Sequence, residues 1–135
     1  MNREAVVPTR ADWRTQYDDY HVSPAVRVGD QVYCCGITGW DPETGGYSPD
    51  AEEQFDRTFR NVAEVLEAAG CGWQDVVKAV SYHVGELHEH IPTFVRVCDR
   101  HVREPYPVWS AAVVVALPHP GAFVQIEATA VMSDG

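Results

Sequence analysis

The sequence predicts one α+β domain in which two helices cover a single face of a β-sheet. The chain has 135 residues, enough for one ordinary core and too few for two. Apolar residues make up 45% of it and charged residues 22%, a composition typical of a folded globular domain. Segments with strand-like alternation flank two segments with helical spacing, and together they run in the order ββαβαββ.

The first predicted elements are a hairpin and a helix. Two extended runs, 25–28 and 31–36, flank Gly29-Asp30, and glycine supplies the positive φ that a two-residue turn requires. A helix is expected to start near Ser48-Pro49-Asp50, where proline is tolerated in the first turn. Apolar residues then recur at three- and four-residue spacing up to the helix-ending Gly70: Phe55, Phe59, Val62, Val65, Leu66 and Ala69.

The second half of the chain predicts three strands and another helix. Residues 76–84 alternate as a strand, and a helix is expected to start near Pro92. Strands over 108–117 and 122–132 follow, joined by the turn-forming segment 117–121. Residues 1–20 are expected to be a polar lead-in, so that the whole chain, 1–135, forms one domain.

The strand over 108–117 is apolar on both of its faces. Trp109, Val113 and Leu117 alternate with Val108 and other small apolar residues. Because two helices can cover only one face of the sheet, the other face needs a different cover, and another subunit is the simplest one. The pattern therefore predicts an oligomer.

Charge and composition exclude several classes of function. Twenty acidic and ten basic residues give a formal net charge of −10, which disfavours nucleic acids and anionic membranes as partners. Lys78 is the single lysine, which disfavours pyridoxal chemistry. The longest apolar run, 111–117, is too short to span a membrane. Four cysteines and an N-terminus without a secretory pattern predict a reduced, cytoplasmic protein.

No cofactor or metal is expected. His83, His88 and His90 are close in sequence, but a His-x-His near a helix start points in divergent directions, and no Cys-x-x-Cys pair accompanies it. The acidic run at 50–53 suits the N-terminus of a helix without any ligand.

Motifs along most of the chain resemble the YjgF/RidA (reactive intermediate deaminase) family. The similarity covers roughly residues 23–132, in order and at the family's spacing. The motifs that carry it are Ser23-Pro24-Ala25-Val26-Arg27-Val28-Gly29-Asp30, Cys35-Gly36, Gly39-Trp40-Asp41-Pro42-Glu43-Thr44-Gly45, Asn61-Val62, Leu66-Glu67-Ala68-Ala69-Gly70, Asp75-Val76-Val77-Lys78, Pro105-Tyr106-Pro107, Leu117-Pro118 and Ile126-Glu127-Ala128.

The resemblance implies a chorismate-mutase-like subunit that forms a homotrimer with ligand clefts between subunits. It also implies cofactor-independent hydrolysis of reactive enamines and imines to a carbonyl compound and ammonia. In the family, an arginine in a Pro-x-Arg motif anchors the substrate carboxylate, but this chain has Trp109 there, and an indole cannot clamp a carboxylate. Val22 replaces a family tyrosine, and Cys35 stands where a serine is common.

Glu127 is the main catalytic candidate, because it matches the family glutamate that positions or activates water. Strand alternation turns it away from the more apolar face, and a carboxylate in a partly desolvated cleft can act as general acid or base. Cys35 is a second candidate, as an apolar wall, a weak donor or an activated thiol. Trp109 is either a core aromatic or a surface on which a flat substrate stacks. The other substrate-binding candidates are Val22, Gly36, Trp40, Ser110, Ala111 and, at the rim, His119.

Three functions remain open on sequence alone. The first is imine or enamine hydrolysis on a small substrate that lacks the usual carboxylate or presents it elsewhere. The second is a diverged biosynthetic enzyme that uses Glu127 for tautomerisation or cyclisation. The third is a ligand-binding trimer without chemistry. A retained carboxylate favours chemistry, since burying one costs free energy that a binding protein need not spend.

Overall fold

The computed structural model describes residues 2–133 and contains one six-stranded sheet in the order β1-β2-β3-β6-β4-β5. Only β4 and β5 run parallel, and the other neighbours are antiparallel. The strands are β1 (Glu4–Val6), β2 (Ala25–Val28), β3 (Gln31–Cys34), β4 (Val76–His83), β5 (Val108–Val113) and β6 (Val124–Val131). The helices are α1 (Ala11–Tyr20), α2 (Ala51–Ala68) and α3 (Leu87–His101), with a 3-10 turn η1 (Trp73–Asp75) before β4.

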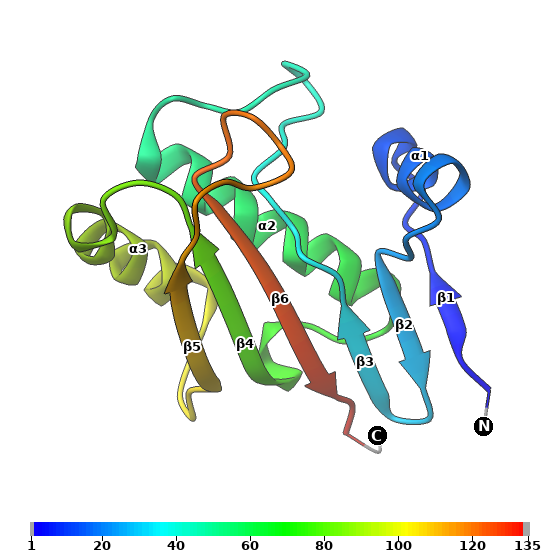
Figure 1. Cartoon of the computed structure of the whole chain (residues 1–135). Coiled ribbons are helices and arrows are strands. Elements are labelled where there is room, and N and C mark those ends of the chain that lie inside the picture. Colours follow the sequence, from blue (N-terminus) through cyan, green and yellow to red (C-terminus); the bar gives the residue numbers. More distant parts are fainter. Residues whose placement is uncertain (1, 134–135) are drawn as a thin grey trace.

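Helices α2 and α3 cover one face of the sheet, and the other face is open (Figure 1). Helix α2 buries an apolar stripe against the sheet, and Phe94 and Val97 of α3 complete the layer. The predicted order ββαβαββ is confirmed from β2 to β6. The hairpin turn is also confirmed, with Gly29 at φ +60°, and α2 begins after Asp50, whose carboxylate accepts a hydrogen bond from the Glu53 amide at 3.3 Å.

The prediction that residues 1–20 are a lead-in is wrong, because β1 and α1 lie within them. β1 adds to the edge of the sheet beside β2. Trp13 of α1 is only 5% exposed. Arg10 lies over the Trp13 ring and donates a 2.8 Å hydrogen bond to Glu64 of α2. The helix is therefore fixed by one buried aromatic and an ion pair, and not by an apolar stripe.

Two other predicted boundaries differ from the structure. Helix α3 starts at Leu87, five residues before Pro92, so the proline lies in the second turn and not at the start. Strand β5 ends at Val113, four residues earlier than predicted, and β6 starts at Val124. The long connection between them is held by Gln54 of α2, whose buried amide donates to the Gly121 carbonyl at 3.0 Å.

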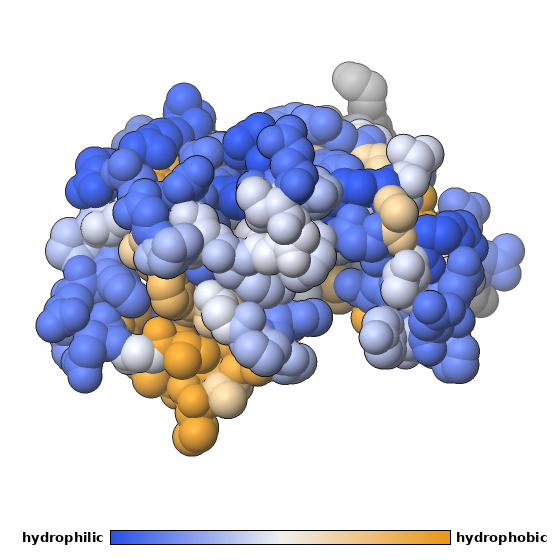
Figure 2. All heavy atoms as spheres, turned by 90° about the horizontal axis from the view of Figure 1, so that it is seen from above, coloured by the Kyte–Doolittle hydropathy of each residue, from blue (hydrophilic) through white to orange (hydrophobic). Residues whose placement is uncertain are grey.

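The open face carries the second apolar surface that the sequence predicted. Val108, on the open face of β5, is 67% exposed, and Val115, in the segment that follows β5, is 100% exposed. Figure 2 shows an apolar patch on the side of the molecule where β5 lies. A patch of this kind on an otherwise acidic chain marks a surface for association.

Candidate functional site

Glu127 lies in the middle of β6, and its side chain is on the open face. Its neighbours Ile126 and Ala128 are buried under the helices, whereas Glu127 is partly exposed. The hydroxyl of Tyr82 on β4 donates a hydrogen bond to Glu127 Oε1 at 3.1 Å. This contact raises the pKa of Tyr82, so the phenol keeps its proton near neutral pH. The carboxylate is thus held in place by a neutral donor.

A β-bulge interrupts the sheet beside Glu127. Tyr33 pairs with Thr129 and Ile37 pairs with Ile126, so one strand advances 37 − 33 = 4 residues while the other advances 129 − 126 = 3. The extra residue falls in the segment 34–36. Bulges of this kind re-aim side chains and leave backbone groups unpaired. Within residues 2–133, the Gly36 amide donates no hydrogen bond.

Gly36 allows the close approach of the Gln125 side chain. A Cβ atom on Gly36 would overlap the amide group of Gln125, so no other residue fits without moving that side chain. Gln125 precedes Glu127 by two residues and pairs with Tyr82 in the β4–β6 register, so all three side chains share the open face. The glycine therefore lets an amide group lie along the bulge next to the carboxylate.

Cys35 lies in the same bulge and close to Glu127. Burial raises the pKa of its thiol, and the Glu127 charge adds to this, while a hydrogen bond from Gln16 opposes it. Gln16 Nε2 lies 3.4 Å from Cys35 Sγ. The thiol is therefore protonated at neutral pH and suits a weak donor or an apolar wall better than a nucleophile. Cys34 points into the core as expected, and burial raises its pKa to about 12.

Val22 and Ser110 are also near this group. The Val22 carbonyl accepts a 3.5 Å hydrogen bond from Gln16 Nε2, the same atom that contacts Cys35. Ser110 of β5 pairs with Val80 of β4, which pairs with Glu127. Paired residues share a face, so Ser110 is on the open face two strands from Glu127. We call the group formed by Gln16, Val22, Cys35, Gly36, Tyr82, Gln125 and Glu127 the carboxylate site.

The structure does not bring Trp109 to Glu127. Its indole stacks on Trp73 with 6.2 Å between ring centroids and 8° between planes, and its Nε1 donates to Ser81 Oγ at 3.0 Å. Ser81 is fully buried under the helices, so Trp109 lies on the helix-covered face. Ala111 pairs with Ser81 and lies on that face too. Within one chain Trp109 and Glu127 therefore lie on opposite faces of the sheet, and a cleft shared by the two residues across subunits stays a prediction.

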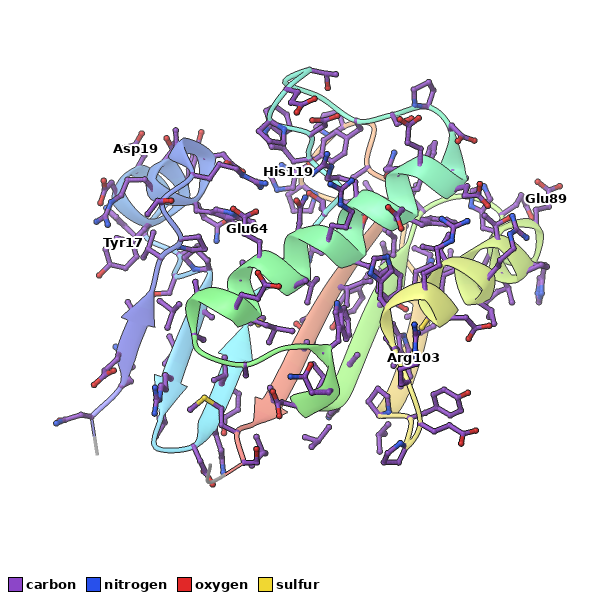
Figure 3. The ribbon with its side chains drawn as sticks, turned by 180° about the vertical axis from the view of Figure 1, so that it is seen from behind. Tyr17, Asp19, Glu64, Glu89, Arg103 and His119 are labelled. Carbon is purple, nitrogen blue, oxygen red and sulfur yellow. The ribbon has the colours of Figure 1, made fainter. Side chains whose placement is uncertain are left out.

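Trp40 and His119 form a different cluster, in the loops beyond the end of the sheet. Both rings lie against Tyr47, Trp40 edge-on at 5.7 Å and His119 tilted at 6.4 Å between centroids. Figure 3 shows His119 in this loop region. No hydrogen bond or ring contact joins the cluster to the carboxylate site in the described chain. The structure therefore supports a packing role for Trp40 and His119, which hold their two loops together through Tyr47.

The described residues offer no prepared metal site and no membrane span. No three His, Cys, Asp or Glu side chains among residues 2–133 gather closely enough to hold a metal ion. None of the helices in this range is long and apolar enough to cross a membrane.

Comparison with known proteins assigns the chain to a family. The Endoribonuclease L-PSP family model matches residues 17–132. The chain belongs to the YjgF/RidA family. It is 30% identical to the RutC family protein YjgH of Escherichia coli over 117 residues, which cover 87% of each protein. It is 36% identical to a 2-iminobutanoate/2-iminopropanoate deaminase of Capra hircus over 81% of this chain and 78% of that protein.

Solved structures of YjgF/RidA proteins share the fold. The YjgH structure superposes with a TM-score of 0.84 at 28% identity and covers all of both chains. RidA from a Psychrobacter species has a TM-score of 0.76 at 34% identity, covering 82% of this chain and 88% of the other. The α+β architecture is thus that of YjgF-family structures.

The sequence pattern of this YjgF/RidA chain does not identify three residues of the carboxylate site, namely Tyr82, Gln125 and Gln16. Tyr82 is on the same face of its strand as Val80, and Gln125 is on the same face as Glu127. Strand alternation could therefore have identified both residues. Gln16 could not be identified in this way, because it comes from the segment expected to be a lead-in. Its place depends on how α1 packs, which no local pattern shows.

The cations of this YjgF/RidA chain lie mostly away from Glu127. Arg27 pairs with buried Val32 and so points to the helix-covered side, Arg96 binds Glu52 of α2, and Arg103 follows α3 (Figure 3). Lys78 is on the open face, paired with Thr129, and forms no ion pair with Glu127 in the described chain. The groups in contact with one another around Glu127 are all uncharged.

Proposed function

We propose that the chain is a Rid-like deaminase that hydrolyses small imines and enamines without a carboxylate group, using Glu127 as general acid and base. The observation that carries this proposal is the open-face Glu127 carboxylate, held by Tyr82 among neutral polar groups. The deaminase names of several relatives support the reaction class.

The reaction is the addition of water to a C=N bond followed by loss of ammonia. Glu127 takes a proton from water as the oxygen attacks the imine carbon, and the proton then passes to the nitrogen. Glu127 then takes the hydroxyl proton of the carbinolamine and returns it to the nitrogen as the C–N bond breaks, which releases ammonia and leaves a carbonyl compound. An enamine first gains a proton at carbon and loses one from nitrogen to become the imine. Tyr82 keeps the carboxylate oriented, Cys35 and Gly36 form the wall beside it, and Gln125 offers an amide to the substrate.

Charge supports a substrate without a carboxylate. The net charge of −10 and the Glu127 carboxylate repel anions and attract neutral or protonated nitrogen compounds. Trp109 stands where the family resemblance implies an anchoring arginine. Its indole stacks on Trp73 and donates a hydrogen bond to Ser81. A long polynucleotide is disfavoured for the same electrostatic reason. Four cysteines without disulfides support a reducing, cytoplasmic setting.

The functional unit is proposed to be a homotrimer with three such sites at its subunit interfaces. The open face exposes Val108, the segment after β5 exposes Val115, and the family resemblance implies this assembly. We expect light scattering at micromolar concentration to give about three times the 15.0 kDa subunit mass. Exchanging Val108 and Val115 for aspartate should dissociate it. A wild-type mass of one subunit would contradict the proposal.

The substrate preference is tested with two imines that differ only in a carboxylate. An amino-acid oxidase acting on alanine generates 2-iminopropanoate, and an amine oxidase acting on ethylamine generates ethanimine. We expect the protein to accelerate ammonia release from ethanimine and to leave 2-iminopropanoate near its background rate, because a missing charge-assisted contact costs orders of magnitude in rate.

The opposite preference would show that a cation anchors carboxylate substrates, and a Lys78→Met variant would then identify Lys78 if the preference disappeared with it. Acceleration of neither imine would overturn the deaminase proposal. In that case a ligand-binding trimer or a proton-transfer enzyme of another pathway becomes the better description.

A further inference from the structure

Helix α1 brings a side chain to the carboxylate site from outside the part of the chain that the family model matches. The match begins at residue 17, and Gln16 precedes it by one residue. The helix is firmly placed, since Trp13 is buried and Arg10 binds both Glu64 and Asn61 of α2. Figure 3 shows Glu64 on the part of α2 that faces α1. The backbone position of Gln16 is therefore fixed by the packing of the helix.

The contacts of Gln16 set the orientation of its amide. Nε2 lies 3.5 Å from the Val22 carbonyl and 3.4 Å from Cys35 Sγ. A backbone carbonyl can only accept, so the nitrogen of the amide must face it. The amide oxygen, on the same carbon, is left without a donor within residues 2–133. The backbone carbonyl of Gln16 also ends the helix by accepting from the amides of His21 and Val22.

We propose that Gln16 is a substrate-binding and specificity-determining residue, whose amide oxygen accepts a hydrogen bond from an N–H of the substrate. This inference rests on the proposed function and names the substrate group that the site recognises. Cys35 links Gln16 to the neighbourhood of Glu127, because its thiol contacts the Gln16 amide and the next residue, Gly36, abuts Gln125, which shares a strand face with Glu127. An imine or iminium nitrogen placed between them finds an acceptor on one side and the carboxylate on the other.

The same arrangement selects against carboxylates. Carboxylate oxygens are acceptors only, so a substrate carboxylate facing the free oxygen of Gln16 and Glu127 meets two acceptors and a negative charge. A nitrogen group that carries N–H donors meets partners at both places. Discrimination then follows from unfavourable contacts with the wrong ligand as well as favourable ones with the right ligand.

A stable pair of probes tests this without turnover. Acetamidine is a planar, protonated C–N compound without a carboxylate, and acetate is its carboxylate counterpart. Binding of each is measured by calorimetry or by chemical-shift titration in wild type, Gln16→Leu, Gln16→Glu and Gln74→Leu. Leucine removes both the donor and the acceptor of the amide, whereas glutamate removes the donor and keeps the acceptor. Gln74 is an exposed glutamine in η1 and serves as the matched control.

We expect wild type to bind acetamidine and to discriminate against acetate. Gln16→Leu should weaken acetamidine binding roughly three- to tenfold, the loss of one ordinary hydrogen bond, while Gln16→Glu binds at least as tightly as wild type. Gln74→Leu should match wild type. Equal losses in Gln16→Leu and Gln16→Glu would mean that the donors to Val22 and Cys35 matter and the free oxygen does not, and they would overturn the inference.

Failure of this inference is distinguishable from failure of the proposed function. Acetamidine binding that is unchanged in Gln16→Leu, or absent in wild type, overturns the role of Gln16. If wild type and Gln16→Leu nevertheless accelerate ethanimine hydrolysis equally, the deaminase proposal stands without it. If acetamidine binding depends on Gln16 but no imine is hydrolysed, Gln16 remains a binding residue and the deaminase proposal is wrong.

Discussion

Replacing Glu127 by glutamine is expected to lower the rate of ethanimine hydrolysis by roughly 10²- to 10⁴-fold, the usual contribution of a general acid or base. Glutamine keeps the size of the side chain and can still accept from the Tyr82 hydroxyl, which now lies 3.1 Å from Glu127 Oε1. It cannot take a proton from water. Acetamidine should still bind, though more weakly, because the neutral Gln125 and Gln16 amides remain.

Two control variants separate proton transfer from general damage. Glu67→Gln makes the same chemical change on an exposed position of α2 and should leave the rate unchanged. Tyr82→Phe removes only the donor that orients Glu127 and should cost less than Glu127→Gln. An unchanged rate in Glu127→Gln would make the carboxylate a spectator and favour a binding role for the protein.

Sequence pattern predicted the elements whose burial is periodic and missed those held by single contacts. Helix α2 carries an apolar stripe from Phe55 to Leu66, so its spacing alone defines it. Helix α1 buries only Trp13, and its remaining residues are mostly polar. Its stability comes from Arg10 reaching α2 across more than fifty residues of sequence, which no local window can reveal.

The candidate site was predicted where strand alternation decided it. Glu127 was expected to point away from the core, and it does, because its neighbours along β6 are fully apolar and buried. Alternation could not decide the same question for β5, whose two faces are both apolar. The direction of Trp109 depends on its pairing with Ala79 of β4, which is buried under the helices.

Trp109→Arg is therefore expected to destabilise the fold, and no gain in 2-iminopropanoate turnover should accompany it. The arginine would lose the stacking on Trp73 and the contacts with Phe59 and Phe94, and it would bring a charge under the helices beside the buried Ser81. Losing a large aromatic from such a layer lowers the free energy of unfolding by about 3 kcal/mol. Denaturant unfolding at fixed protein concentration measures the change.

Trp109→Phe is the matched variant, because it keeps an uncharged aromatic ring beside Trp73 while removing part of the indole, including the N–H that donates to Ser81 at 3.0 Å. Its cost should be smaller than that of Trp109→Arg, about 1 to 2 kcal/mol for one hydrogen bond and some lost packing, and ethanimine hydrolysis should be unaffected in the folded protein, since the indole lies on the face opposite Glu127. A Trp109→Arg variant that is as stable as wild type and hydrolyses 2-iminopropanoate would show that the side chain at position 109 reaches the open face. The resemblance to arginine-bearing relatives would then extend to the anchor itself, and the preference for carboxylate-free imines would have to be attributed to the loss of that one residue.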